Sequence, residues 1–138
     1  MKKTFLLFIL FIFWGCKNME DVSADFYFFD GGSYKMISIK QNEREIYSNI
    51  HKLISETDDI LRLLVSEERI DMIKNKEKGI EIIFEKRITI RSKKLGVFKI
   101  NKVLIPFDGY YVGKDSDSMT TIFIGDGNYI SGPLRNSN

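Results

Sequence analysis

The spacing of apolar residues changes along the chain, and the first segment with a regular pattern predicts a β-hairpin. Aromatic and β-branched runs at residues 26–29 and 34–39 flank the sequence Asp30, Gly31, Gly32. Glycine adopts the positive φ angles that tight hairpin turns require. The two runs are therefore expected to pair as antiparallel strands.

The next segment has the period of an α-helix. Its apolar residues recur at intervals of three, four or seven: Ile46, Ile50, Leu53, Ile54 and Leu61. This spacing predicts an amphipathic helix that begins near Gln41. Ser66, followed by two glutamates, is typical of a helix N-cap and predicts a short second helix, which Gly79 would end. Residues 60–65 between them fit either a continued helix or a short strand.

The second half has the period of two that is typical of β-strands. Ile80, Ile82, Phe84, Ile88 and Ile90 alternate with Glu81, Glu85, Arg87, Thr89 and Arg91, which places the second set on a solvated face. Ile83 and Lys86 break the alternation and indicate a bulge or bend at residues 85–87. Short strands are expected within residues 97–105, 110–112, 119–124 and 129–130, followed by a loose terminus.

Together these patterns predict one α+β domain over residues 25–138. It would consist of an N-terminal β-hairpin, one main amphipathic helix plus a short second helix, and an antiparallel β-meander with the helix packed on the sheet.

The N-terminal segment has a different character. Lys2 and Lys3 precede ten consecutive apolar residues, 5–14, which end at Gly15 and Cys16. Ten residues are too few for a helix to cross a bilayer, which needs about 20. Positive charge, a short apolar core and a small residue are typical of a secretory signal peptide. With the cysteine directly after the small residue, the segment resembles the signal peptides of bacterial lipoproteins.

The resemblance implies cleavage after residue 15, acylation of the Cys16 thiol and a tether over residues 16–24 that holds the domain close to a bacterial membrane. Lys17 differs from the aspartate that retains such proteins at the inner membrane, which favours the outer membrane; the periplasmic or surface side stays open. Phe13 and Trp14 depart from the family pattern, which usually has leucine and then a smaller residue. An ordinary signal with an incidental cysteine, or an uncleaved anchor, are the alternatives.

Charge is segregated along the chain. The formal net charge of +2 for 138 residues equals the contribution of Lys2 and Lys3, so the mature chain is expected to be neutral. Residues 41–72 hold eight acids and four bases, whereas residues 73–102 hold ten bases and three acids. Seven bases of the second segment form a candidate cationic contact patch: Lys86, Arg87, Arg91, Lys93, Lys94, Lys99 and Lys102.

Two interpretations of this patch stay open. It could contact an anionic partner, such as phospholipid headgroups, lipopolysaccharide or an acidic protein, or it could protect sheet edges from pairing with other chains. Nucleic acid is not expected, because only Phe98 lies nearby to stack on a base.

Catalytic motifs are absent from the sequence: it contains no G-x-S-x-G, S-x-x-K, H-E-x-x-H or C-x-x-C. His51 is the only histidine, and the calcium-like start at Asp115 lacks its central glycine, since Thr120 stands there. No cofactor, no metal and no catalytic residue are therefore predicted.

The sequence favours a membrane-anchored lipoprotein of the cell envelope that acts as a small non-catalytic binding, inhibitor or accessory module. The alternative is an envelope hydrolase or ligand-binding protein with a carboxylate-lined pocket between helix and sheet. The oligomeric state stays open.

Overall fold

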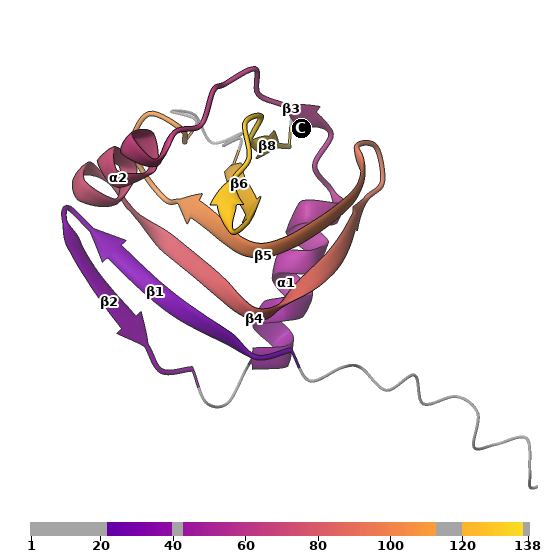
Figure 1. The fold of residues 1–138 in the computed structure, drawn as a ribbon, viewed down its shortest axis with the longest axis horizontal. Helices are drawn as coiled ribbons and strands as arrows, with labels where there is room; N and C mark the ends of the chain where they lie inside the picture. The colour runs from indigo at the N-terminus through magenta and orange to yellow at the C-terminus, as the bar shows by residue number, and fades with distance from the viewer. Residues whose placement is uncertain (1–21, 40–42, 113–119, 137–138) are drawn as a thin grey trace, which may run out of the picture.

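The computed structural model describes residues 22–39, 43–112 and 120–136, which form two helices and an eight-stranded antiparallel sheet (Figure 1). The strand order is β2-β1-β4-β5-β6-β8-β3, and β7 pairs with β6 beside this path. The predicted α+β class, with a hairpin, a main helix, a short second helix and a meander, is confirmed.

The N-terminal hairpin consists of β1 (Ala24–Asp30) and β2 (Ser33–Ile37). Gly31 and Gly32 have φ angles of 54° and 93°, the left-handed conformation that favours glycine and that the turn requires. β1 begins at Ala24, the last residue assigned to the tether from the sequence, and pairs on its other side with β4.

The longest strands, β4 (Lys78–Ser92) and β5 (Gly96–Pro106), form the centre of the sheet. Their register shifts between Ile83 and Ile88, which confirms the bulge predicted at residues 85–87. Figure 1 shows both strands curving strongly across the molecule. The irregularity separates a proximal half of the β4–β5 hairpin, next to β1, from a distal half that ends in the turn at residues 93–95.

The remaining strands are short. β6 (Thr121–Asp126) pairs with β5, β7 (Asn128–Tyr129) folds back on β6, and β8 (Leu134–Arg135) joins β6 to β3 (Asp59–Ile60). The expectation of a loose terminus after residue 130 is wrong for Leu134 and Arg135, which form β8. The Leu134 side chain is fully buried, and its burial holds the segment in the sheet.

The two helices cover opposite faces of the sheet. α1 (Glu43–Ser55) packs Ile54 against a cluster that includes Ile82 and Val103. α2 (Glu67–Lys76) packs Ile73 against a second cluster that includes Leu104. Because successive strand residues point to opposite faces, the neighbours Val103 and Leu104 contribute to different cores. We call the two sides of the sheet the α1 face and the α2 face.

Some predicted boundaries are wrong. Gly79 does not end α2, which stops at Lys76; it lies inside β4, where a β-carbon would collide with Phe29 and the Ile105 carbonyl. Leu61 is not on α1, which ends at Ser55. Of the ambiguous residues 60–65, only Ile60 belongs to a strand, at the end of β3.

Other expectations are met in part or fall elsewhere. At residues 110–112 the structure has only an isolated bridge between Val112 and Thr120. Gln41 and the calcium-like residues 115–118 lie outside the described residues. Neither helix within those described ranges has the length and hydrophobicity of a membrane span.

Candidate functional site

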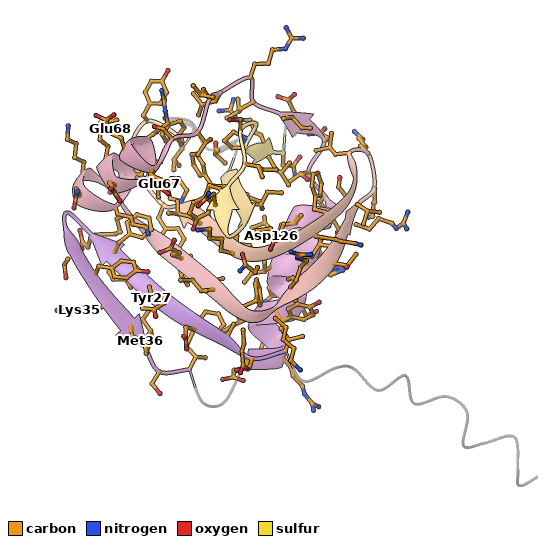
Figure 2. All side chains as sticks on the ribbon, viewed as in Figure 1. Tyr27, Lys35, Met36, Glu67, Glu68 and Asp126 are labelled. Carbon is orange, nitrogen blue, oxygen red and sulfur yellow. The ribbon has the colours of Figure 1, made fainter. Side chains whose placement is uncertain are left out.

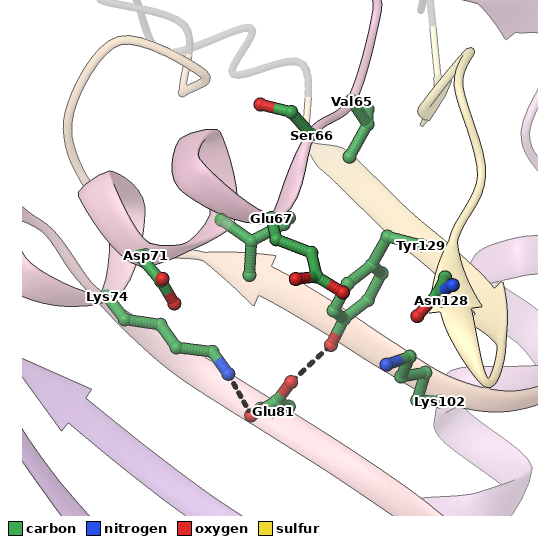
Figure 3. A pocket seen from close by; sticks show the side chains of 10 residues that line it. Val65, Ser66, Glu67, Asp71, Lys74, Glu81, Lys102, Asn128 and Tyr129 are labelled. Carbon is green, nitrogen blue, oxygen red and sulfur yellow. Dashed lines mark hydrogen bonds and ion pairs between the residues drawn. The ribbon is translucent and has the colours of Figure 1, made fainter.

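A cavity of about 370 Å³ lies between α2 and the α2 face of the sheet (Figure 3). Residues of α2 form one wall and residues of β4, β5 and β7 form the others. The lining is mostly polar: Val65, Ser66, Glu67, Ile70, Asp71, Lys74, Glu81, Lys102, Asn128 and Tyr129.

The floor of the cavity is the carboxylate of Glu81, whose side chain is only 3% exposed. One of its oxygens accepts a hydrogen bond from the Tyr129 hydroxyl at 2.5 Å. The other accepts from the Tyr34 hydroxyl at 2.5 Å and forms an ion pair with Lys74 Nζ at 2.6 Å. Three donors from β2, α2 and β7 thus converge on one strand residue.

Burial of Glu81 corrects the expectation that it lies on a solvated face. Glu81 alternates with Ile80 and Ile82 as predicted, so its side chain points to the opposite face of β4. That face is shielded from solvent at Glu81. There α2 and the tyrosines cover the sheet surface, and a charged group so enclosed requires partners. Lys74 and the two tyrosine hydroxyls supply them.

The pKa shifts in the cluster indicate which of its groups are ionised near neutral pH. Burial acts to raise the pKa of Glu81, but hydrogen bonds from Lys74, Tyr129 and Tyr34 outweigh it, and the pKa is lowered. Burial, reinforced by the negative charge of Glu81 and the hydrogen bond to it, raises the pKa of both tyrosines. The carboxylate is therefore ionised and the hydroxyls stay protonated near neutral pH.

Aromatic contacts hold the cluster in place. The Tyr34 ring stacks on Tyr27 with centroids 4.7 Å apart, and Lys74 Nζ lies 5.0 Å from the Tyr34 centroid. On the other side of Glu81, Lys102 Nζ lies 4.6 Å from the centroid of Tyr129. Both lysines thus lie close to a tyrosine ring, an arrangement that adds cation–π attraction.

This geometry is suited to binding more than to proton transfer. A general acid or base needs a pKa near the working pH and access to the substrate. Glu81 has a lowered pKa, and its oxygens are occupied by Tyr34, Tyr129 and Lys74. Glu67 and Asp71, higher on the α2 wall, leave carboxylate groups facing the cavity, as Figure 3 shows.

Most of this site was not recognised from the sequence. The general expectation of a carboxylate-lined pocket between helix and sheet describes its kind. Among the candidate site residues only Lys102 belongs to it, and Lys102 was assigned to the cationic patch. Tyr34 and Tyr129 are nearly a hundred residues apart. They meet at Glu81 because β2, β1, β4, β5, β6 and β7 pair in register. An acidic residue within a strand of isoleucines was the one local signal.

The seven predicted patch residues lie along the β4–β5 hairpin but do not form one cluster. Lys102 lines the cavity, Arg87 pairs with Asp126 at 2.6 Å, and Lys94 pairs with Asp58 at 3.2 Å. The other four are exposed on the distal half or at the bend: Lys86, Arg91, Lys93 and Lys99. Cys16 lies outside the described residues.

A second cavity of about 350 Å³ lies on the other side of α2 and is lined largely by apolar side chains, among them Leu63, Ile73 and Tyr111. Glu77 lies at its edge. One of its carboxylate oxygens accepts from the Tyr110 amide at 3.3 Å, and the other is buried without a hydrogen-bond partner. Burial raises the pKa of Glu77.

Within residues 22–39, 43–112 and 120–136, no group of three histidine, cysteine or acidic side chains is placed to hold a metal ion. Comparison with known proteins finds no matching family model, no similar curated protein and no similar solved structure.

Proposed function

We propose that this protein is a lipoprotein of a bacterial cell envelope, anchored through Cys16, with the outer membrane favoured, and that its domain is a small non-catalytic binding module. The observation that carries the proposal is the position of the only cysteine, directly after Gly15 at the end of ten apolar residues. Two or more acyl chains at that cysteine give stable anchoring, since each buried methylene adds about 0.8 kcal/mol.

The site supports binding over catalysis. Glu81 is ionised and fully hydrogen-bonded, and Tyr34 and Tyr129 retain their protons, so the cluster offers a rigid polar surface. The partner would be another envelope protein or an anionic envelope surface. An inhibitor or accessory subunit acts in this way, through surface complementarity with no chemistry of its own.

The anchor is tested by the intact mass of the membrane-extracted protein and of a Cys16→Ser variant. We expect the unchanged protein to begin at Cys16, to carry the added mass of acyl chains and to stay with membranes after a high-salt wash. The variant should lack this mass and leave the membrane fraction. A mature chain that starts beyond residue 16, or carries no lipid, contradicts the proposal.

The binding role is tested by cross-linking the anchored protein in intact cells and purifying it from solubilised membranes. A stoichiometric partner is expected. The matched variant is Glu67→Gln/Asp71→Asn, which changes the cavity rim without touching the Glu81 cluster. Turnover of an envelope substrate by the purified protein, with no partner captured, would favour an enzyme instead.

The cavity itself favours a second candidate function, the binding of a small polar ligand. Its volume of about 370 Å³ is at the small end of ligand sites, and Glu67, Asp71 and Asn128 line it with hydrogen-bonding groups. Unlike Glu81, neither Glu67 nor Asp71 has an ion-pair partner in the described parts of the chain. These free carboxylates favour a ligand that donates hydrogen bonds or carries an ammonium group.

This second candidate is tested with three compounds of similar size and different charge: glucosamine, glucose and gluconate. If the carboxylates select the ligand, glucosamine should raise the melting temperature most and gluconate least. The Glu67→Gln/Asp71→Asn variant should remove that difference. Equal shifts in melting temperature with all three compounds, or the same shifts in the protein and the variant, contradict selection by this cavity.

A further inference from the structure

Half of the α2 face of the sheet has no helix over it. α2 covers the proximal part of the β4–β5 hairpin, whereas the distal half exposes the side chains that point away from buried Ile88, Ile90 and Ile100. These exposed residues are Arg87, Thr89, Arg91, Val97 and Lys99, which we call the cationic face.

The cationic face carries positive charge with little compensation. Arg87 pairs with Asp126 from the β6–β7 turn at 2.6 Å. Arg91 and Lys99 have no ion pair with any residue that the structure describes, and they lie diagonally across two paired strands. Val97, which pairs directly with Arg91 and lies two residues before Lys99 on β5, is 47% exposed. The face thus combines uncompensated positive charge with one exposed apolar side chain.

The chain enters the domain beside this face. The Glu85 amide donates a hydrogen bond to the Ser23 carbonyl at 3.0 Å, so the start of β1 lies at the bend of β4, as Figure 1 shows. Arg87 follows only two residues later. Val22, the first described residue, is six residues after Cys16, so the chain between them spans at most about 20 Å. A lipid on Cys16 therefore keeps Ser23, and with it the bend of β4, within about 25 Å of the bilayer.

The distal half extends away from this point along β4. Arg91 is six residues beyond Glu85 along β4, or about 20 Å in an extended strand. By contrast Lys35, Met36 and Tyr27 lie on the hairpin at the opposite side of the view in Figure 2, two to three strands from β5. Lys35 pairs with Phe28, six residues after Val22, so β2 and the distal hairpin lie at comparable distances from the chain entry. Charge distinguishes them: Lys35 is the only basic residue of β2, whereas the distal half carries Arg87, Arg91 and Lys99.

We propose that the cationic face lies against the anionic phospholipid headgroups of the membrane that holds Cys16. The inference rests on the lipid anchor of the proposed function and adds an orientation to it. Anionic lipid is the occupant favoured over an acidic protein because the tether holds a bilayer permanently near the bend of β4, and because Arg91 and Lys99 leave positive charge uncompensated on the exposed face next to it. Each Lys or Arg near such a surface contributes about 1 kcal/mol, or about fivefold in affinity.

The test uses the lipidated, full-length mature protein in vesicles, with one cysteine introduced. Acylation occupies the thiol of Cys16, so a Val97→Cys variant has a single free thiol, on the cationic face opposite Arg91. Lys35→Cys on β2 is the matched control. The rate of reaction with a charged, membrane-impermeant maleimide is measured in neutral phosphatidylcholine vesicles, in vesicles with about one-third phosphatidylglycerol, and in detergent.

In anionic vesicles we expect Val97→Cys to react at least fivefold more slowly than in detergent or neutral vesicles, while Lys35→Cys reacts equally in all three. Adding Arg91→Gln/Lys99→Gln should weaken contact of the face about 25-fold and restore the reaction. Salt at 1 M should do the same, because it shortens the Debye length to about 3 Å.

Three results would overturn the inference. The first is equal reactivity of Val97→Cys in anionic and neutral vesicles. The second is protection that persists in 1 M salt or in the Arg91→Gln/Lys99→Gln background, which indicates a contact that is not with anionic headgroups. The third is a second free thiol together with failure to float with vesicles. That result shows that Cys16 has no lipid, and it refutes the anchor separately from the orientation.

Discussion

Replacement of Glu81 by glutamine tests the energetics of the site directly. Glutamine has nearly the same shape but no charge, and it presents one oxygen and one amide nitrogen where Glu81 has two accepting oxygens. Tyr129 donates to one of those oxygens, and both Tyr34 and Lys74 donate to the other. In Glu81→Gln the amide nitrogen must face at least one donor, and Lys74 loses its counter-charge.

The size of the effect follows from the burial. A hydrogen bond to a charged group contributes about 1.5–3 kcal/mol, and removal of one partner from a buried ion pair costs about 3–5 kcal/mol. Glu81 is 3% exposed, but Lys74 is 24% exposed and regains some hydration. We therefore expect a loss of about 3 kcal/mol, which lowers the melting temperature by about 10 °C at about 4 °C per kcal/mol.

Urea unfolding monitored by circular dichroism measures this loss. Glu85→Gln is the matched control, because Glu85 lies four residues further along the same strand with an exposed side chain. It should change the free energy of unfolding by no more than about 0.5 kcal/mol. If Glu81→Gln lowers the free energy of unfolding by less than about 1 kcal/mol, at an unchanged denaturant slope, the assignment of Glu81 as a buried, ionised acceptor is refuted.

The pH dependence gives an independent check. Because the folded state lowers the pKa of Glu81, its stabilising contribution is complete above the unfolded carboxyl pKa of about 4.3 and is lost as the pH falls through the lower folded value. The stability difference between the protein and Glu81→Gln should therefore be constant from about pH 6 to 8 and shrink below about pH 4. A difference that does not change on acidification contradicts this account.

Three further substitutions have defined outcomes in thermal unfolding. Gly79→Ala should destabilise by at least about 1–3 kcal/mol, because its β-carbon would meet the Ile105 carbonyl oxygen at 2.5 Å; a neutral result contradicts the packing of β4 on β5. Ser66→Ala should cost about 1 kcal/mol, since it removes the acceptor for the Arg69 amide at 3.2 Å; an unchanged melting temperature contradicts this cap. Glu77→Gln should raise the melting temperature at pH 7–8 and leave it unchanged at pH 4. Burial raises the pKa of Glu77, so the ionised carboxylate lowers stability above the unfolded pKa. A lower melting temperature for the variant at pH 8 contradicts this sign.

Secondary structure was predictable where residues adjacent in sequence determine it. The Gly31-Gly32 turn, the stripe from Ile46 to Ile54 and the Ser66 cap each depend on neighbours within four residues, and each is confirmed. Gly79 was misassigned for the same reason. A glycine after a helical pattern normally indicates a helix end, whereas here close approach of Phe29 and β5 requires it.

The candidate site was less predictable, because its members come from four separate elements. Nothing near Glu81 in the sequence indicates that Tyr34 and Tyr129 lie at its two carboxylate oxygens. Their meeting depends on the register of β1 with β2 and with β4, and on the turn between β6 and β7. A shift of one residue in the β1–β2 register would place Tyr34 on the α1 face, away from Glu81.

The sequence by itself thus determined the α+β class, the main elements and the bulge near residue 86, because these follow from local periodicity and turn chemistry. It also carries the basis of the proposed anchor, in the order of Lys2, the apolar run and Cys16. Tertiary structure decided which polar residues became buried. α2 crosses one half of the sheet and leaves the other half open, so Glu81 is enclosed and ion-paired while Arg91, on the same strand, remains in solvent.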